Sequence, residues 1–190
     1  MLSLEQKNNN EIKFMELLTK LDIDLTELNK LLGSVGYFDA PASTQYFGAY
    51  PGGLCEHALR IAHELGVLCN AYFPGRYTEA DVIKVAFFKD FYKATMYESY
   101  MKNVKNEETG QWEMMPAYRT REGTNRVVFG DLGFSSYMQI KNLIPLNEEQ
   151  IEAIVYSRPS DFAPDIHDVL RTYPLVTLTR MAEIAATYIS

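Results

Sequence analysis

The sequence has little cysteine and little histidine, with two cysteines, three histidines and one tryptophan in 190 residues. Cys55 and Cys69 stand on one predicted helix, where a rise of ~1.5 Å per residue separates them by roughly 21 Å. A disulfide needs Cα atoms within about 7 Å, so these two cannot pair. No CxxC or Cys/His cluster accompanies them, which argues against a cysteine metal site. We therefore expect two reduced, buried thiols, as in cytosolic proteins.

Long apolar runs are also missing. No stretch approaches the ~18 uninterrupted apolar residues that a transmembrane helix needs. Residues 1–10 contain no hydrophobic segment of the kind found in secretory signals. We expect a protein of the cytoplasm that does not engage a membrane.

Positive charge is the third scarcity, since 18 Lys and Arg stand against 25 Asp and Glu, for a net charge of -7. This argues against a protein that coats nucleic acid through bulk charge, although a local basic groove stays open. A hydrophobic content of 47% with 13% aromatic residues excludes intrinsic disorder. The length suits a single domain, 1–190, with a substantial core.

Apolar residues recur at helical spacing through most of the chain. An N-terminal helical segment, 1–33, carries a leucine-rich stripe from residue 11, with a break near 22–24 where Asp24 is a suitable N-cap. Gly52 and Gly53 open a strong helix, and Thr78 caps a long helix predicted over 79–100. Further helices are predicted at 133–144, at 147–157 with Asn147 as N-cap, and at 174–189.

One segment departs from the helical period. In 101–128, alternating apolar and polar residues flank the turn Asn106–Gly110, which is typical of a β-hairpin. The predicted fold class is therefore all-α, a helical bundle with one small inserted β-hairpin.

His57 has the most informative surroundings of the three histidines. His57 and His63 are about 240° apart around one helix and cannot chelate one metal together. His63 and His167 are expected to be structural or exposed. Gly52-Gly-Leu-Cys-Glu-His57-Ala resembles the first metal-ligand helix of the HD-domain metal-dependent phosphohydrolases, which typically read Gly-Gly-Leu-Leu-Glu-His-Ser there.

The resemblance continues along the chain, from about residue 35 to 189, and points to a phage and bacterial subgroup of that family. It covers segments in conserved order: Tyr37–Ser43 with Tyr46, Lys102–Lys105 with Trp112, Tyr173–Thr177 and Ala186–Ile189. It implies the HD-domain helical fold, and a divalent metal (Mn, Mg, Fe or Ni) that activates water against a phosphoester.

The ligand positions that the resemblance implies are mostly replaced. The signature His-Asp pair falls on Lys89-Asp90, and the family lysine that follows falls on Lys93. The remaining positions are His57 and Glu183, which are potential ligands, and Phe47, Leu132 and Ser157, which are not.

A protonated lysine has donors but no lone pair, so it cannot bind a metal. We therefore expect no metal and no confident catalytic residue, with Lys89, Asp90 and Lys93 as vestiges. Either lysine would neutralise Asp90 and Glu183 in place of the ion. The alternative is a site of His57, Asp90 and Glu183, or one that Asp131 completes.

Two further groups are ligand-binding candidates. The aromatic residues Tyr46, Phe47 and Tyr50 either line a pocket over the former site or, as we favour, plug it. Arg119 and Arg121, beside Arg126, Trp112 and Tyr118, form either a patch for phosphate or single-stranded nucleic acid or an ordinary solvated hairpin.

Three functions follow from these observations. The first is a catalytically inactive HD-domain protein, plausibly phage-encoded and then in the host cytoplasm, that binds a partner protein or a nucleotide-like ligand. The second is a divergent metal-dependent phosphohydrolase that acts on nucleotides or nucleic-acid phosphoesters. The third is a nucleic-acid-binding module that uses the hairpin; it is less favoured. An oligomer is compatible with all three.

Overall fold

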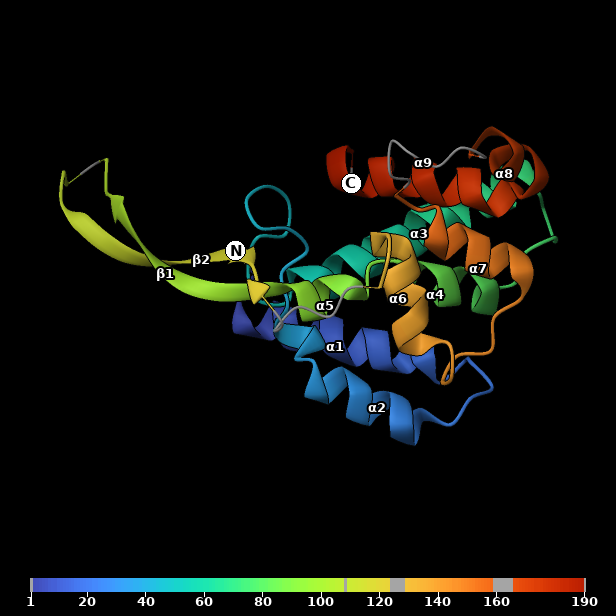
Figure 1. Cartoon of the computed structure of the whole chain (residues 1–190), viewed down its shortest axis with the longest axis horizontal. Helices are drawn as coiled ribbons and strands as arrows, with labels where there is room; N and C mark the ends of the chain where they lie inside the picture. Colours follow the sequence, from blue (N-terminus) through green and yellow to red (C-terminus); the bar gives the residue numbers. More distant parts are fainter. Residues whose placement is uncertain (1, 108, 124–128, 159–165, 190) are drawn as a thin grey trace.

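The computed structural model describes residues 2–107, 109–123, 129–158 and 166–189. Its helices gather into one body, and a two-stranded hairpin projects from this body as an arm (Figure 1). The described elements are α1 (Leu4–Leu18), α2 (Leu25–Ser34), the 3-10 helix η1 (Tyr37–Asp39), α3 (Gly53–Tyr72), α4 (Glu79–Phe88), α5 (Tyr92–Met96), β1 (Tyr97–Lys105), β2 (Trp112–Thr120), α6 (Leu132–Ile140), α7 (Glu148–Val155), α8 (Ile166–Thr172) and α9 (Pro174–Tyr188). The predicted class, helical with one small hairpin, is confirmed.

The N-terminal segment forms two helices with a break where the sequence predicted it. Asp24 caps α2 by accepting a hydrogen bond from the Thr26 backbone amide at 2.8 Å. α1 begins at Leu4, earlier than the predicted stripe, because Ser3 and Gln6 form a reciprocal capping box.

α3 is the central helix and packs against α1, α4 and α9. Its buried face includes Leu54, Ile61 and Leu65. Its first residue, Gly53, lies so close to the aromatic loop that a Cβ there would come 2.1 Å from the Gly48 carbonyl oxygen. Only glycine permits this contact, which holds the loop against the start of α3.

The predicted helix over 79–100 is wrong beyond Phe88. α4 ends there, a turn at 89–91 follows, α5 is short, and residues 97–100 belong to β1. The Ser136 hydroxyl on α6 accepts from the Tyr92 backbone amide at 3.0 Å and donates to the Lys89 carbonyl at 2.9 Å. These two bonds satisfy backbone groups that a continuous helix would have paired, so tertiary contacts override the local helical pattern.

The hairpin is antiparallel, with Tyr97 opposite Thr120 at its base and Lys105 opposite Trp112 near its tip. Its first strand begins four residues before the predicted boundary of 101 and its second ends at Thr120. Residues 124–128, which the sequence included in this insertion, lie outside the described residues.

The C-terminal helices agree with the predicted ones, and Asn147 caps α7 through a capping box with Gln150. α8 was not predicted; residues 159–165, immediately before it, lie outside the described residues. Pro174 occupies the first turn of α9, where its missing N–H costs nothing. Within the described part, no helix has both the length and the apolar character needed to cross a membrane.

Candidate functional site

Three elements that are distant in sequence bring potential metal ligands together. His57 lies on α3, Asp90 in the turn after α4, and Glu183 on α9. One ligand atom from each lies within 4.8 Å of the others. His57 and Asp90 are buried and Glu183 is partly buried. This is the residue set that the sequence put forward for a metal, if the chain held one.

Lys89 occupies the point where the two carboxylates meet. Its Nζ lies 2.8 Å from Asp90 Oδ2 and 2.5 Å from Glu183 Oε2, and its side chain is fully buried. Lys93 Nζ lies 2.9 Å from the same Asp90 oxygen and is also fully buried. The expectation that one of the two lysines lies between Asp90 and Glu183 is met by Lys89, whereas Lys93 pairs with Asp90.

Two further groups complete the hydrogen bonding of Glu183. His57 Nε2 lies 3.1 Å from Oε2, so it donates in the tautomer that carries a proton on Nε2. Arg158 Nη2 donates to Oε1 at 2.9 Å, and Arg158 Nε lies 3.9 Å from Asp90 Oδ1. Sequence reasoning missed Arg158, although it directly follows Ser157, a position that the resemblance had placed at the site.

The pKa values follow from burial and from these contacts. Burial by itself would lower the pKa of Lys89, but the charges of Asp90 and Glu183 outweigh it and the pKa is raised. Burial would likewise raise the pKa values of Asp90 and Glu183, yet Lys89 above all holds both well below their usual range. All three side chains are therefore charged at neutral pH.

The pKa values of Lys93 and His57 are both lowered, in contrast to that of Lys89. Burial lowers the pKa of Lys93 to about 8, because Asp90 opposes it only in part and Arg158 and Lys89 add repulsion. Burial also lowers the pKa of His57 by more than its contact with Glu183 raises it. His57 is thus neutral at pH 7, and Lys93 is the least compensated charge of the group.

This donor set does not fit a divalent cation. An ammonium group stands between the carboxylates, and it repels a cation while offering no lone pair. Both Glu183 oxygens accept hydrogen bonds, as does Asp90 Oδ2. Of the four carboxylate oxygens of Asp90 and Glu183, Asp90 Oδ1 is the one that is buried without a hydrogen-bond partner. A metal would have to displace Lys89 before it could reach two carboxylates.

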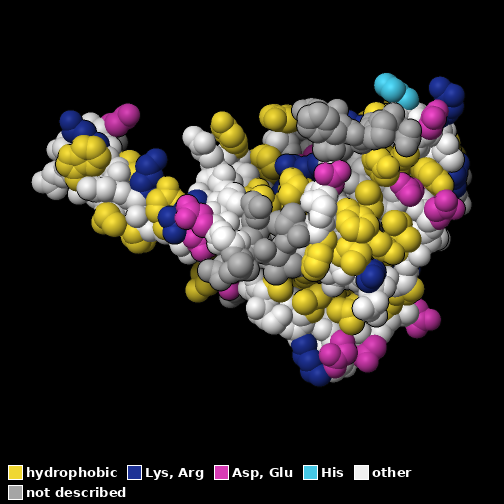
Figure 2. Space-filling model, in the orientation of Figure 1, with side chains coloured by type: hydrophobic (Ala, Val, Ile, Leu, Met, Phe, Trp, Pro, Cys, Tyr) yellow, Lys and Arg dark blue, Asp and Glu magenta, His cyan; other side chains and the backbone are white. Residues whose placement is uncertain are grey.

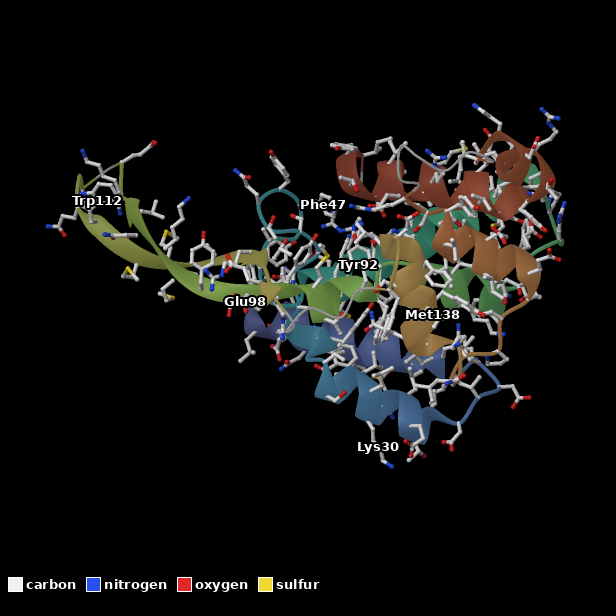
Figure 3. All side chains as sticks on the ribbon, in the orientation of Figure 1. Lys30, Phe47, Tyr92, Glu98, Trp112 and Met138 are labelled. Carbon is white, nitrogen blue, oxygen red and sulfur yellow. The ribbon has the colours of Figure 1, made fainter. Side chains whose placement is uncertain are left out.

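Phe47 packs against this group from the aromatic loop. Its ring centroid lies 4.6 Å from that of His57, and Lys93 Nζ lies 5.4 Å from it in a cation–π contact. In Figure 3, Phe47 lies between its loop and the helical body. The neighbouring cavity, lined by Phe47, Tyr50 and His57 among others, measures about 30 Å³. That is the space of roughly one water molecule, too small for a nucleotide.

The other two aromatic candidates do not enter the group. Tyr46 is 82% exposed. The Tyr50 hydroxyl donates to Glu56 Oε2 at 2.5 Å, and partial burial together with that carboxylate raises its pKa to about 12. Of the predicted aromatic candidates, Phe47 alone is packed on His57.

The hairpin arginines are engaged within the hairpin and not at the site. Arg119 Nε lies 2.8 Å from Glu98, and its guanidinium lies 5.4 Å from the Tyr100 ring centroid. Arg121 Nε donates to the Tyr97 carbonyl at 3.0 Å. Arg126 lies outside the described residues.

The positions of the replaced ligands have structural roles. Ser157 is buried and its hydroxyl donates to the Ile154 carbonyl at 2.8 Å. Leu132 is the first residue of α6, and Asp131 is the exposed N-cap of that helix. In the described part of the chain, Asp131 is not grouped with His57, Asp90 and Glu183.

Comparison of the chain with family models, with curated proteins and with solved structures found no match.

Proposed function

We propose that this protein is a catalytically inactive relative of the HD-domain phosphohydrolases that acts by binding a partner. The helical class and the grouping of His57, Asp90 and Glu183 agree with the resemblance seen in the sequence. The family assignment and the function remain part of the proposal.

The observation that carries the proposal is the position of the Lys89 ammonium, in contact with both carboxylates. A positive charge held between carboxylates does electrostatically what a cation would do, since it offsets their repulsion and their burial. It cannot polarise a phosphoryl oxygen as a Lewis acid or lower the pKa of a bound water. The group therefore stabilises the junction of α3, α4 and α9 without supplying the chemistry of a metallohydrolase.

The surroundings of the group also favour a binding role. A catalytic metal site keeps one position open for water or substrate. Here Phe47 lies on His57, and the adjacent cavity holds about one water. The cavity beside His57 is therefore too small to hold a phosphoester.

A second candidate, a divergent metal-dependent phosphohydrolase, has one observation in its favour. The three potential ligand atoms already lie within 4.8 Å of one another, and Asp90 Oδ1 lacks a hydrogen-bond partner. If Lys89 swung away, these groups would form a one-histidine, two-carboxylate site.

Metal titration of the purified protein separates the two candidates. We expect no stoichiometric binding of Mn²⁺ by calorimetry, no Mn²⁺-dependent hydrolysis of a general phosphodiester, and no change in either result for Asp90→Ala. Tight one-to-one binding of Mn²⁺, with hydrolysis that Asp90→Ala abolishes, would overturn the proposal in favour of the hydrolase.

A further inference from the structure

The arm carries an apolar face along its outer half. Directly opposed residues of an antiparallel pair point to the same side, so Met101 with Pro116, Asn103 with Met114, and Lys105 with Trp112 share one face. We call the apolar members of this set, Met101, Trp112, Met114 and Pro116, the arm face. The opposite side is more mixed: it carries the charged residues Glu98, Arg119, Lys102 and Glu113 together with Tyr100, Val104 and Met115.

The arm face is open to solvent. Met101 is 54%, Trp112 66% and Met114 59% exposed. Figure 2 shows apolar side chains on the arm, which stands clear of the helical body, and Figure 3 shows Trp112 near its tip. An isolated two-stranded hairpin is only marginally stable in water. A long arm with an apolar face is therefore expected to rest on another surface.

The same chain has a second apolar surface of matching character. Met181, Ile184 and Tyr188 follow one another at helical spacing on α9 and are 37%, 58% and 82% exposed. We call these three residues the α9 face. α9 has two charged residues, Arg180 and Glu183, and Glu183 is turned toward Lys89. Contact between the two faces would thus desolvate no carboxylate.

We propose that the arm face of one copy docks on the α9 face of a second copy, and the reverse, in a two-fold symmetric dimer. The dimensions agree: a nine-residue strand spans ~30 Å at about 3.3 Å per residue, and the fifteen residues of α9 span ~22 Å at 1.5 Å per residue. One arm is long enough to cover the whole α9 face.

The placement of the two faces also suits a two-fold axis. In Figure 1 the arm leaves the body toward the same end to which the C-terminal end of α9 points. A second copy turned by a half rotation would send its arm back along the first copy's α9. In such an isologous contact each copy supplies both faces, so the association closes at two.

The exposed area reaches the scale of a stable interface. Aromatic side chains of this kind offer on the order of 150–250 Å² each, so the exposed parts of Trp112 and Tyr188 alone come to roughly 300 Å². The methionines, Pro116 and Ile184 add to this on both faces of each copy. A standard interface buries about 800 Å² per partner. A lone arm or a lone helix face would fall short, and the two together approach it.

A second copy of the chain would be one partner for the binding role proposed above. The dimer is argued from the arm and α9, and the loss of catalysis from Lys89, so either proposal can fail without the other. Sedimentation velocity on the full chain tests it. We expect a dimer for the native chain, monomers for Met114→Lys and Ile184→Lys, and a dimer for the control Leu4→Lys, whose side chain is 74% exposed on α1. A native chain that stays monomeric at high micromolar concentration overturns the proposal, as does a dimer that survives both variants.

Cross-linking identifies the faces in contact. Met114→Cys and Ile184→Cys are prepared as separate single variants, and Cys55 and Cys69 are buried and do not interfere. On mild oxidation, we expect the mixture to give a disulfide-linked heterodimer of the two variants. If oxidation links only Met114→Cys to itself, or yields no heterodimer, the arm does not rest on α9. Binding of a single-stranded oligonucleotide by a monomer, lost on Met114→Lys, would assign the arm to nucleic acid instead.

Discussion

Replacement of Lys89 by methionine removes one buried charge while keeping the length of the side chain. Lys89 contacts both Asp90 and Glu183 and has no exposed surface. Without its ammonium, two carboxylates remain close together, with Arg158, Lys93 and His57 to compensate them. The junction of α3, α4 and α9 is held through these groups, so we expect the whole fold to lose stability.

The expected loss is large on the scale of a single substitution. Removal of one partner from a buried ion pair costs about 3–5 kcal/mol, because the other charge stays buried without compensation. The total free energy of unfolding of a typical domain is ~5–15 kcal/mol. In a chain of this length each kcal/mol shifts the melting temperature by roughly 2–4 °C, so Lys89→Met should melt about 10 °C below the native chain.

Lys93→Met is the matched control. Lys93 is equally buried, but its pKa is lowered to about 8, which means that burial outweighs the attraction of Asp90. Its replacement leaves Asp90 with Lys89 as counter-ion at 2.8 Å, so no carboxylate loses its last lysine partner, and we expect a smaller loss of stability than for Lys89→Met. Urea unfolding followed by circular dichroism gives both free energies, with equal m-values as the check on two-state behaviour.

The reasoning fails if Lys89→Met is as stable as the native chain, or if Lys93→Met is the more damaging of the two. A second measurement guards against general misfolding. Adding Glu183→Gln to Lys89→Met removes one of the uncompensated charges, so the double variant should be more stable than Lys89→Met alone.

Three further predictions test other parts of the structure. First, because the pKa of Lys93 is lowered from 10.5 to about 8, the folded chain releases this proton at a lower pH than the unfolded chain, so stability should rise between about pH 7.5 and 8.5. The buried thiols of Cys55 and Cys69, whose pKa values are raised from 9.0, oppose this rise increasingly toward pH 9. Lys93→Met should remove the rise in urea titrations. Second, Gly133→Ala should lower the free energy of unfolding by about 1–3 kcal/mol, because the added Cβ would lie 2.2 Å from the Val155 carbonyl oxygen. Gly66→Ala has open space around its Cβ and should instead stabilise α3 by about 0.5–1 kcal/mol. Thermal melts of the two variants distinguish these outcomes. Third, Lys89→His should bind Mn²⁺ with one-to-one stoichiometry by calorimetry, because it replaces the repelling ammonium with a nitrogen ligand; absence of binding would show that the remaining ligands are held too rigidly or too far apart.

The helices could be predicted wherever local signals were strong. Asp24, Thr78 and Asn147 each cap a helix through a side-chain bond that is readable from the sequence. The break after Phe88 could not be read in this way. It depends on Ser136, which is distant in sequence and supplies the hydrogen bonds that a helix would otherwise form.

The candidate site could be predicted in part. The grouping of His57, Asp90 and Glu183 followed from the resemblance, and the position of a lysine between the carboxylates followed from charge. Arg158 was missed because it lies in a segment without periodicity, and nothing local shows that its guanidinium reaches Glu183.

The central polar contacts also constrain how the chain folds. His57 and Glu183 are 126 residues apart in sequence, and Lys89 and Glu183 are 94 apart. Contacts of such long range form late, because the loop between them must close first. Before α9 packs against α3 and supplies Glu183, packing of α3 on α4 would bury Lys89 and Lys93 with Asp90 alone, of the two site carboxylates, to compensate them. A chain that ends before α9 is thus expected to remain unfolded, and during synthesis the body should assemble only after α9 has left the ribosome.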